Sequence, residues 1–168
     1  TIVVNEYDLD PTQTCFRIPG SFFGSPPAAG LGWGLGAAMG AKLAAPEKTV
    51  IAVVGDGSYI FGAPTAAHFT ARASDIPILT VIFNNQAWNA VKRATVDENP
   101  DGWAVRTGNM PMTELEPSPA FELVAQASGA YTERVENPEA LPDALCRAVK
   151  AVRVERRQAL LNVICRKP

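Results

Sequence analysis

The 168-residue chain is long enough for one domain with a buried core, and its composition is that of a globular protein, with 47% hydrophobic and 19% charged residues. The net charge is −2, from 15 basic and 17 acidic residues, and no basic run is longer than a pair such as Arg156 and Arg157. Such a chain presents no surface for nucleic acid phosphates. No apolar run approaches the roughly 18 residues needed to cross a bilayer. We therefore expect no nucleic acid partner and no membrane partner.

The cysteines give no sign of a disulfide framework or a metal finger. Cys15, Cys146 and Cys165 are odd in number, widely spaced and without a CxxC pair. We therefore expect reduced, mostly buried thiols in a cytoplasmic protein.

Apolar strands and helical segments alternate along the chain. In chain order, we expect a strand at residues 2–4, a Gly/Pro-rich loop at 19–27, a helix at 30–45, a strand at 49–54, a helix at 64–73, a strand at 78–83, a helix beginning near residue 88, a long loop at 95–119, helices at 119–128 and 138–155, and a strand at 159–165. Strands that are apolar throughout and separated by helices indicate a parallel sheet. We therefore expect a doubly wound α/β fold with a mostly parallel sheet, helices on both faces and ligands at the carboxyl ends of the strands.

The helix predicted at 30–45 is unusually rich in glycine. Leu35, Met39 and Leu43 recur every four residues, which favours a helix. Each glycine in a helix interior costs about 1 kcal/mol relative to alanine. We therefore expect a backbone or a ligand to pass very close to this helix.

Two strand ends carry unusual polar residues. The first strand ends in Gly-Asp-Gly-Ser at 55–58, and the second in Asn-Asn-Gln-Ala at 84–87. Because the carboxyl ends of parallel strands meet at one edge of a sheet, these side chains should lie close together. A carboxylate and an amide oxygen suit Mg²⁺, which takes its other ligands from phosphates and water. The glycines beside Asp56 also let a backbone approach closely and leave N–H groups free at a helix start.

These two ends and the sequence around them resemble the thiamine diphosphate enzymes. That family has a GDG motif followed at a set distance by an NN pair, and here 26 residues separate Gly57 from Asn84. The stretches PGSFF, AGLGWGLGAAMGAKLAAPEKTVIAVVGDGS and PILTVIFNNQAW are similar to the benzoylformate decarboxylase and acetolactate synthase branch, and the resemblance covers nearly the whole chain. It implies that the chain is the diphosphate- and metal-binding domain of such an enzyme.

The resemblance also implies individual roles at the strand ends. It makes the side chains of Asp56 and Asn85 and the backbone carbonyl of Ala87 the protein ligands of Mg²⁺, whose coordination diphosphate oxygens and water complete. The neighbouring residues expected to contact the diphosphate are Gly55, Gly57 and Ser58.

A second group of expected contacts surrounds the organic part of the cofactor. By resemblance, Leu31 is the apolar residue that enforces the bent conformation of thiamine diphosphate. Ala29, next to Gly30, accepts a hydrogen bond from the aminopyrimidine through its carbonyl. Trp88 follows the metal ligands at a position that often faces the substrate in this branch.

The implied activity is decarboxylation of a small 2-oxo acid, transfer of the resulting acyl carbanion to an acceptor, or both. No catalytic residue is expected in this chain, because the activating Glu of the family lies on a separate pyrimidine-binding domain, and Glu6 is not its equivalent. The chain begins inside a strand without an initiator Met. We therefore expect residues 1–168 to be a single domain, either the C-terminal part of a longer three-domain enzyme or a small subunit. The resemblance implies a homo-oligomer (dimer or tetramer) or a heteromer.

An alternative function of another class is a non-catalytic diphosphate- or nucleotide-binding module, or a regulatory remnant. The presence of Asp56, Asn85 and Leu31 together argues against decay, because a remnant has no need of all three. A dinucleotide site is a poorer alternative. Gly32, Gly34 and Ala37 match its loose fingerprint, but the preceding segment is a loop and the fingerprint requires a strand.

Overall fold

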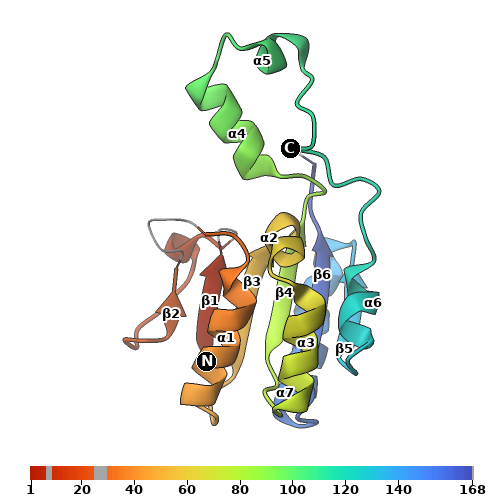
Figure 1. Cartoon of the computed structure of the whole chain (residues 1–168). Helices are drawn as coiled ribbons and strands as arrows, with labels where there is room; N and C mark the ends of the chain where they lie inside the picture. Colours follow the sequence, from red (N-terminus) through yellow and green to blue (C-terminus); the bar gives the residue numbers. More distant parts are fainter. Residues whose placement is uncertain (7–8, 25–29, 168) are drawn as a thin grey trace.

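The computed structural model describes residues 1–6, 9–24 and 30–167. In chain order its elements are β1 (Ile2–Glu6), η1 (Pro11–Gln13), β2 (Phe22–Phe23), α1 (Trp33–Ala44), β3 (Val50–Gly55), α2 (Asp56–Phe61), α3 (Pro64–Ala73), β4 (Leu79–Asn84), α4 (Asn89–Glu98), α5 (Trp103–Thr107), α6 (Phe121–Gln126), β5 (Tyr131–Val135), η2 (Pro138–Ala140), α7 (Leu141–Arg153) and β6 (Ala159–Ile164) (Figure 1).

Within the described ranges, six strands form one sheet in the order β2-β1-β3-β4-β6-β5. Every neighbouring pair is parallel. The predicted α/β fold is therefore confirmed, with a sheet that is parallel throughout. Because all strands point the same way, the ends of β1, β3, β4 and β6 lie along one edge.

The order of the strands explains which helices cover which face. Crossover connections between parallel strands are right-handed. From β2 to β5 the chain moves in one direction across the sheet, so α1, α3 and α6 lie on one face (Figure 1). It then reverses from β5 to β6, which places α7 on the opposite face. The sheet is thus covered by helices on both sides, as predicted.

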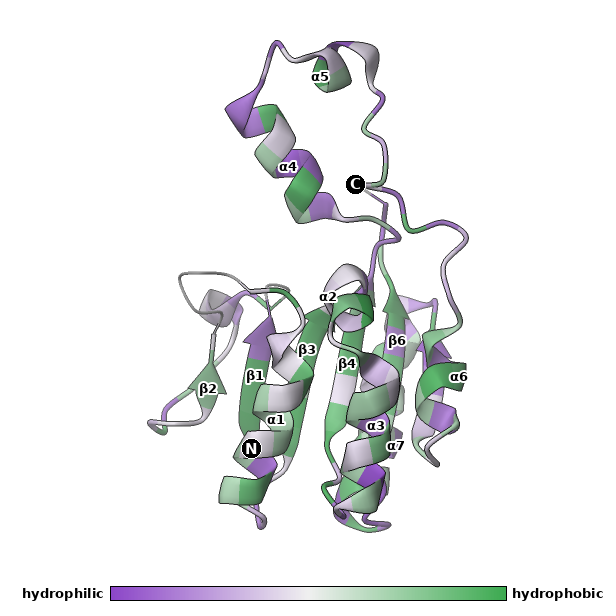
Figure 2. Ribbon diagram, viewed as in Figure 1, coloured by the Kyte–Doolittle hydropathy of each residue, from purple (hydrophilic) through white to green (hydrophobic). Residues whose placement is uncertain are grey.

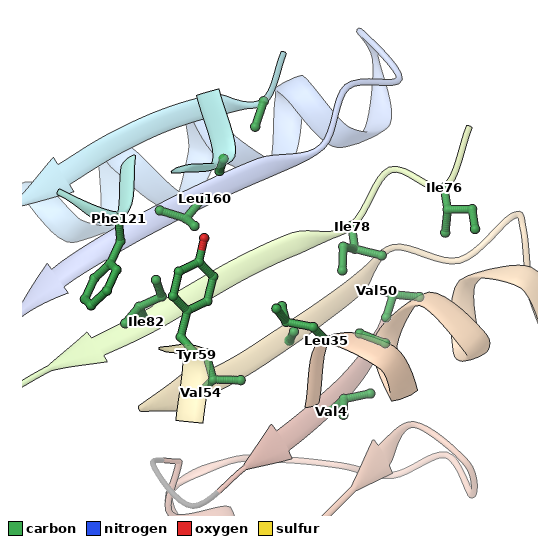
Figure 3. Close-up of a cluster of buried hydrophobic side chains, with 14 residues drawn as sticks. Val4, Leu35, Val50, Val54, Tyr59, Ile76, Ile78, Ile82, Phe121 and Leu160 are labelled. Atoms are coloured by element: carbon green, nitrogen blue, oxygen red, sulfur yellow. The ribbon is translucent and has the colours of Figure 1, made fainter. Parts of the chain in front are cut away.

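Each face has its own apolar core. The larger cluster joins Val4, Val54 and Ile82 of the sheet to Leu35 of α1 and Phe121 of α6 (Figure 3). The second cluster packs a stripe of small residues on α7 against the sheet, and these are Ala144, Ala148, Ala151 and Val152. The central strands β3, β4 and β6 are accordingly mostly hydrophobic (Figure 2).

Several sequence predictions need correction. The segment predicted as a loop at 95–119 contains the end of α4 and all of α5. Three elements of the sheet edge and cavity were not predicted: β2 falls in the segment predicted as a loop at 19–27, α2 begins directly at Asp56, and β5 is a polar strand at the sheet edge. The search for apolar runs missed β5 because an edge strand has one side open to water and carries charged residues there.

The cysteines were predicted to be mostly buried, and that prediction is wrong. Cys15 and Cys146 are exposed, and Cys165 is partly exposed. Cys146 lies two residues from Ala144 and Ala148 of the buried stripe, so the helical period turns its thiol away from the sheet. In the described part of the chain, no helix has both the length and the apolar character to cross a membrane.

Candidate cofactor site

A cavity opens at the carboxyl edge of the sheet, beside the ends of β3 and β4. Its lining residues are Leu31, Gly55, Asp56, Gly57, Ser58, Phe83, Asn85, Ala87, Trp88, Asn89, Ala90 and Val91. Within the described ranges, every predicted site residue except Gly30 lines this cavity. Ala29 lies outside the described residues. The structure therefore brings together the two strand ends and Leu31, which are far apart in the sequence.

Asp56 is the carboxylate of the cavity, and it is almost completely buried, with 3% of its surface exposed. Its Oδ1 accepts a hydrogen bond from the Gly57 N–H at 2.9 Å, and its Oδ2 accepts one from the Gln86 N–H at 2.7 Å. Burial raises the pKa of Asp56, and the backbone donors of Gly57, Gln86 and Ala87 partly oppose that rise. Each carboxylate oxygen keeps a lone pair. A bound cation would therefore offset the cost of burying this charge.

Asn85 faces the same cavity from the end of β4. Its Oδ1 accepts the Ala87 N–H at 3.1 Å. Between them, Gln86 has a positive φ of 61°. A left-handed conformation costs a non-glycine residue about 1–2 kcal/mol, and such strain gathers at functional positions. This bend turns the N–H groups of residues 86 and 87 toward the carboxylate and amide oxygens. We call residues 84–88 the metal loop, after the role that the sequence predicts for Asn85 and Ala87.

The segment at residues 113–115 is hydrogen-bonded to the metal loop. The Trp88 N–H donates to the Thr113 carbonyl at 2.8 Å, and the Leu115 N–H donates to the Gln86 carbonyl at 2.9 Å. On the other side, Asn84 is fully buried and points its amide into the protein. The two asparagines of the NN pair therefore lie in different environments. Asn84 is buried inside the protein, whereas Asn85 faces the cavity.

Glu6 has a role that sequence reasoning missed. It ends β1, is 1% exposed, and accepts hydrogen bonds from the Gly32 N–H at 2.6 Å and the Gly34 N–H at 2.8 Å. These are backbone groups at the start of α1, which would otherwise lack partners. Glu6 thus fixes the beginning of α1 and the adjacent Leu31. No local signal marks this contact, because its partners lie 26 and 28 residues away.

The glycine-rich start of α1 is explained by these close approaches. A Cβ at Gly34 would lie 2.7 Å from Glu6 Oε2, and a Cβ at Gly32 would lie 2.7 Å from the backbone of Gly62. Gly32 also has a φ of 84°, which is why α1 begins later than predicted. The predicted close approach of a backbone is therefore confirmed at Gly32, whereas the close neighbours of Gly34 are the side chains of Glu6 and Val54. By contrast, Gly36 and Gly40 have open space around them.

Gly57 and Trp88 are in contact across the cavity wall. A Cβ at Gly57 would lie 2.7 Å from Cε3 of the Trp88 ring. The aromatic ring of the metal loop therefore packs directly on the first turn of α2. The segments that follow β3 and β4 are therefore in direct contact through Gly57 and Trp88.

A buried hydrogen-bond network anchors α2 to the rest of the fold. The Tyr59 hydroxyl and His68 Nε2 are 2.8 Å apart, and His68 Nδ1 is 2.8 Å from Gln158 Oε1. Gln158 Nε2 donates to the His68 carbonyl, which leaves Oε1 to accept from Nδ1–H. His68 Nε2 then accepts from Tyr59. Burial lowers the pKa of His68 and so favours this neutral form of the imidazole.

The residues present fit a divalent cation that brings further ligands with it. Asp56 and Asn85 supply hard oxygen donors, as Mg²⁺ requires. Among the described residues, no cluster of three or more His, Cys, Asp and Glu side chains is arranged to hold a metal alone. A cation here would need several ligands from phosphate and water. The missing side chain at Gly57 makes room for the Trp88 ring, which borders the cavity.

Comparison with known proteins agrees with this geometry. Residues 11–163 match the family described as "Thiamine pyrophosphate enzyme, C-terminal TPP binding domain". The chain is 30% identical to the sulfoacetaldehyde acetyltransferase of Castellaniella defragrans over 150 residues, which is 89% of this chain and 23% of that protein. It is 31% identical to the acetolactate synthase isozyme 3 large subunit of Escherichia coli over 128 residues, covering 75% of this chain and 20% of that subunit.

Two decarboxylases are also similar. The chain is 43% identical over 86 residues to the benzoylformate decarboxylase of Pseudomonas aeruginosa, covering 51% of this chain and 16% of that enzyme. The structure of the thiamine diphosphate-dependent 4-hydroxybenzoylformate decarboxylase of Rhodococcus jostii RHA1 aligns with a TM-score of 0.77 and 27% identity, covering 100% of this chain and 30% of that one. The chain thus spans less than a third of the length of each of these relatives.

Proposed function

This chain belongs to the family of C-terminal thiamine pyrophosphate-binding domains, and from that premise we propose that it holds the diphosphate end of thiamine diphosphate through Mg²⁺. The observation that carries the proposal is the meeting of Asp56 and Asn85 in one cavity with Leu31. In our proposal Asp56, Asn85 and the Ala87 carbonyl bind the cation. Gly55, Gly57 and Ser58, which line the same cavity, then face the diphosphate.

Each residue has a defined task in this proposal. Asp56 compensates the charge of the cation, and its two backbone hydrogen bonds fix the direction of its lone pairs. Leu31, held through the start of α1 by Glu6, supports the organic part of the cofactor, with Gly30 and Ala29 before it. Trp88 borders the substrate side. Bound thiamine diphosphate supplies the nucleophilic carbon and the electron sink for decarboxylating a 2-oxo acid.

The chain supplies only part of the active site. Of the described residues that line the cavity, Asp56 is the sole carboxylate, and a bound cation would occupy it. A second carboxylate is needed to exchange a proton with the aminopyrimidine, and we propose that a pyrimidine-binding domain of the same or another chain supplies it. The holoenzyme would then be an oligomer or a multidomain chain with the cofactor at the junction.

The substrate class we propose is a small 2-oxo acid, which is decarboxylated, with or without transfer of the acyl group to an acceptor. The relatives include enzymes of both kinds, named decarboxylases, acetolactate synthases and acetyltransferases. The side chains that choose between the two outcomes belong to donor and acceptor pockets that we place outside this chain.

Cofactor binding tests the proposal directly. Thiamine diphosphate with Mg²⁺ should quench tryptophan fluorescence, because Trp88 lines the cavity, and a Trp88→Phe variant should lose most of that quenching. Neither thiamine diphosphate without Mg²⁺ nor ADP with Mg²⁺ should reproduce it. An equal response to ADP would favour the alternative of a general nucleotide-binding module.

Asp56→Ala supplies the matched test of the metal ligand. Loss of even an outer-shell partner of a metal costs about 10–100-fold in affinity, so loss of this ligand should weaken Mg²⁺-dependent binding at least about 100-fold. The control is Glu47→Ala, which removes an exposed carboxylate from the loop before β3. If Asp56→Ala binds the cofactor as tightly as Glu47→Ala does, the assignment is wrong.

A further inference from the structure

A chain of buried and partly buried hydrogen bonds runs from α6 through β6 to the metal loop. Asn162 lies on β6 and is fully buried, as is Asn84. Asn84 Nδ2 donates to Asn162 Oδ1 at 3.1 Å, and Asn162 Nδ2 donates to Glu122 Oε1 at 3.1 Å. Glu122 is on α6, and 14% of its side chain is exposed.

The chain of hydrogen bonds ends at the proposed metal ligand. Asn84 Oδ1 accepts from the Gln86 N–H at 3.2 Å, and the same N–H donates to Asp56 Oδ2 at 2.7 Å. Gln86 is the residue in the left-handed conformation. Four hydrogen bonds therefore connect a carboxylate on α6 to the carboxylate of the cofactor cavity.

The chemistry of the two ends allows only one direction for these hydrogen bonds. A backbone N–H can only donate and a carboxylate can only accept. Asn84 must therefore turn its oxygen to Gln86 and its nitrogen to Asn162, and Asn162 must turn its nitrogen to Glu122. The second donor position of Asn84 is also used, because Nδ2 donates to the Ser118 hydroxyl at 2.9 Å. The Asn84 amide thus has no freedom to flip.

We propose that Glu122 and Asn162 are positioning residues for the metal loop. They act through Asn84, which holds Gln86 in its left-handed conformation and so fixes how Asp56 presents its lone pairs. This inference rests on the proposed function, because it concerns the same cation site. Arg134 Nη1 lies 3.8 Å from Glu122 Oε1, at the outer end of this chain of hydrogen bonds.

The direction of the hydrogen bonds gives a sharp test in the intact protein. Asn162→Asp still accepts from Asn84 but places a second carboxylate against Glu122, with no donor between them. Removing an outer-shell partner typically costs a metal site about 10–100-fold in affinity. At fixed thiamine diphosphate, the Mg²⁺ concentration that half-saturates tryptophan quenching should therefore rise about tenfold.

The double variant Asn162→Asp with Glu122→Gln should restore binding. The amide nitrogen introduced at position 122 can donate to the carboxylate introduced at position 162. The chain of hydrogen bonds is then complete again, with the negative charge at position 162 in place of position 122. We expect half-saturation to return to within about threefold of the starting protein, a large coupling of the kind that double-mutant cycles detect. Glu122→Gln alone should change little, because its amide oxygen can still accept from Asn162.

A control and a second readout separate positioning from general stability. Val163→Ala removes methyl groups from the next residue of β6, which packs in the other core cluster. It should lower the melting temperature without moving the Mg²⁺ half-saturation. Amide hydrogen exchange at Gln86, measured without cofactor, should accelerate in Asn162→Asp and return toward its original rate in the double variant.

The outcomes are distinct. Unchanged half-saturation and unchanged exchange in Asn162→Asp, or a loss that the double variant does not restore, overturns the positioning role. If Asn162→Asp does not fold, Glu122→Ala removes the acceptor at the outer end and takes its place, and again no change overturns the proposal. If the unmodified protein shows no Mg²⁺-dependent quenching, the proposed function fails, while exchange at Gln86 still decides the positioning role.

Discussion

Replacing Gly34 by alanine should destabilise this protein markedly, even though alanine is the better helix former. The new Cβ would lie 2.7 Å from Glu6 Oε2 and 2.9 Å from Val54 Cγ1. Both neighbours are about 1% exposed, so neither can move into solvent. The carboxylate would have to shift away from the start of α1 and weaken its hydrogen bonds to the Gly32 and Gly34 N–H groups.

The size of the effect follows from these contacts. Overpacking a buried site costs about 1–3 kcal/mol, and a hydrogen bond to a charged group contributes about 1.5–3 kcal/mol. The higher helix propensity of alanine offsets this loss of stability by at most about 1 kcal/mol. We therefore expect a net loss of about 2–4 kcal/mol in the free energy of unfolding. For a domain of this size that corresponds to a melting temperature lower by about 5–15 °C.

Gly40→Ala is the matched control on the same helix. Gly40 is exposed and has no heavy atom within 4 Å of a built Cβ. Its replacement should stabilise the protein by about 1 kcal/mol. Urea denaturation and thermal melting of both variants measure the difference. The reasoning is refuted if Gly34→Ala is as stable as Gly40→Ala, because the Glu6 carboxylate would then not restrict the helix.

Three further predictions concern the same region. Glu6→Gln should lower the free energy of unfolding by about 1.5–3 kcal/mol, because an amide has one acceptor oxygen for two N–H donors. Urea denaturation measures this loss. An unchanged denaturation midpoint would show that one acceptor oxygen is enough for both N–H groups. Gly57→Ala should displace the Trp88 ring and shift its emission while leaving the fold intact, and an emission spectrum identical to that of the original protein would contradict the contact. Because burial lowers the pKa of His68, its neutral form stabilises the fold. This stabilisation is complete at a pH above the unfolded-state pKa of about 6.5. As the pH falls from there to the folded-state pKa, the stabilisation decreases by up to about 1.4 kcal/mol per pH unit. The free energy of unfolding should therefore fall more between pH 7.5 and 5.5 in the original protein than in His68→Gln, and equal falls would refute the assignment.

Local patterns in the sequence were sufficient to predict the class of fold and the placement of the two polar strand ends. Apolar runs separated by helical segments specify a parallel sheet, because strands buried on both faces need no polar side. Parallel strands then bring their carboxyl ends to one edge. This is why Asp56 and Asn85, which follow two neighbouring strands, could be expected in one cavity before the structure was known. Their motifs and the spacing between them carried that information.

The support of the site, in contrast, depends on contacts that no local pattern records. Glu6 meets Gly34 across 28 residues, and Asn84 meets Asn162 across 78. Neither pair has a periodic signature, since a lone polar residue on a strand looks the same in sequence whether it faces water or a buried partner. The position of β5 at the edge and the reversal that places α7 on the second face also depend on which strands become neighbours. Only the folded chain brings these distant residues together, so that Glu6 holds the start of α1 and Asn162 contacts the first residue of the metal loop.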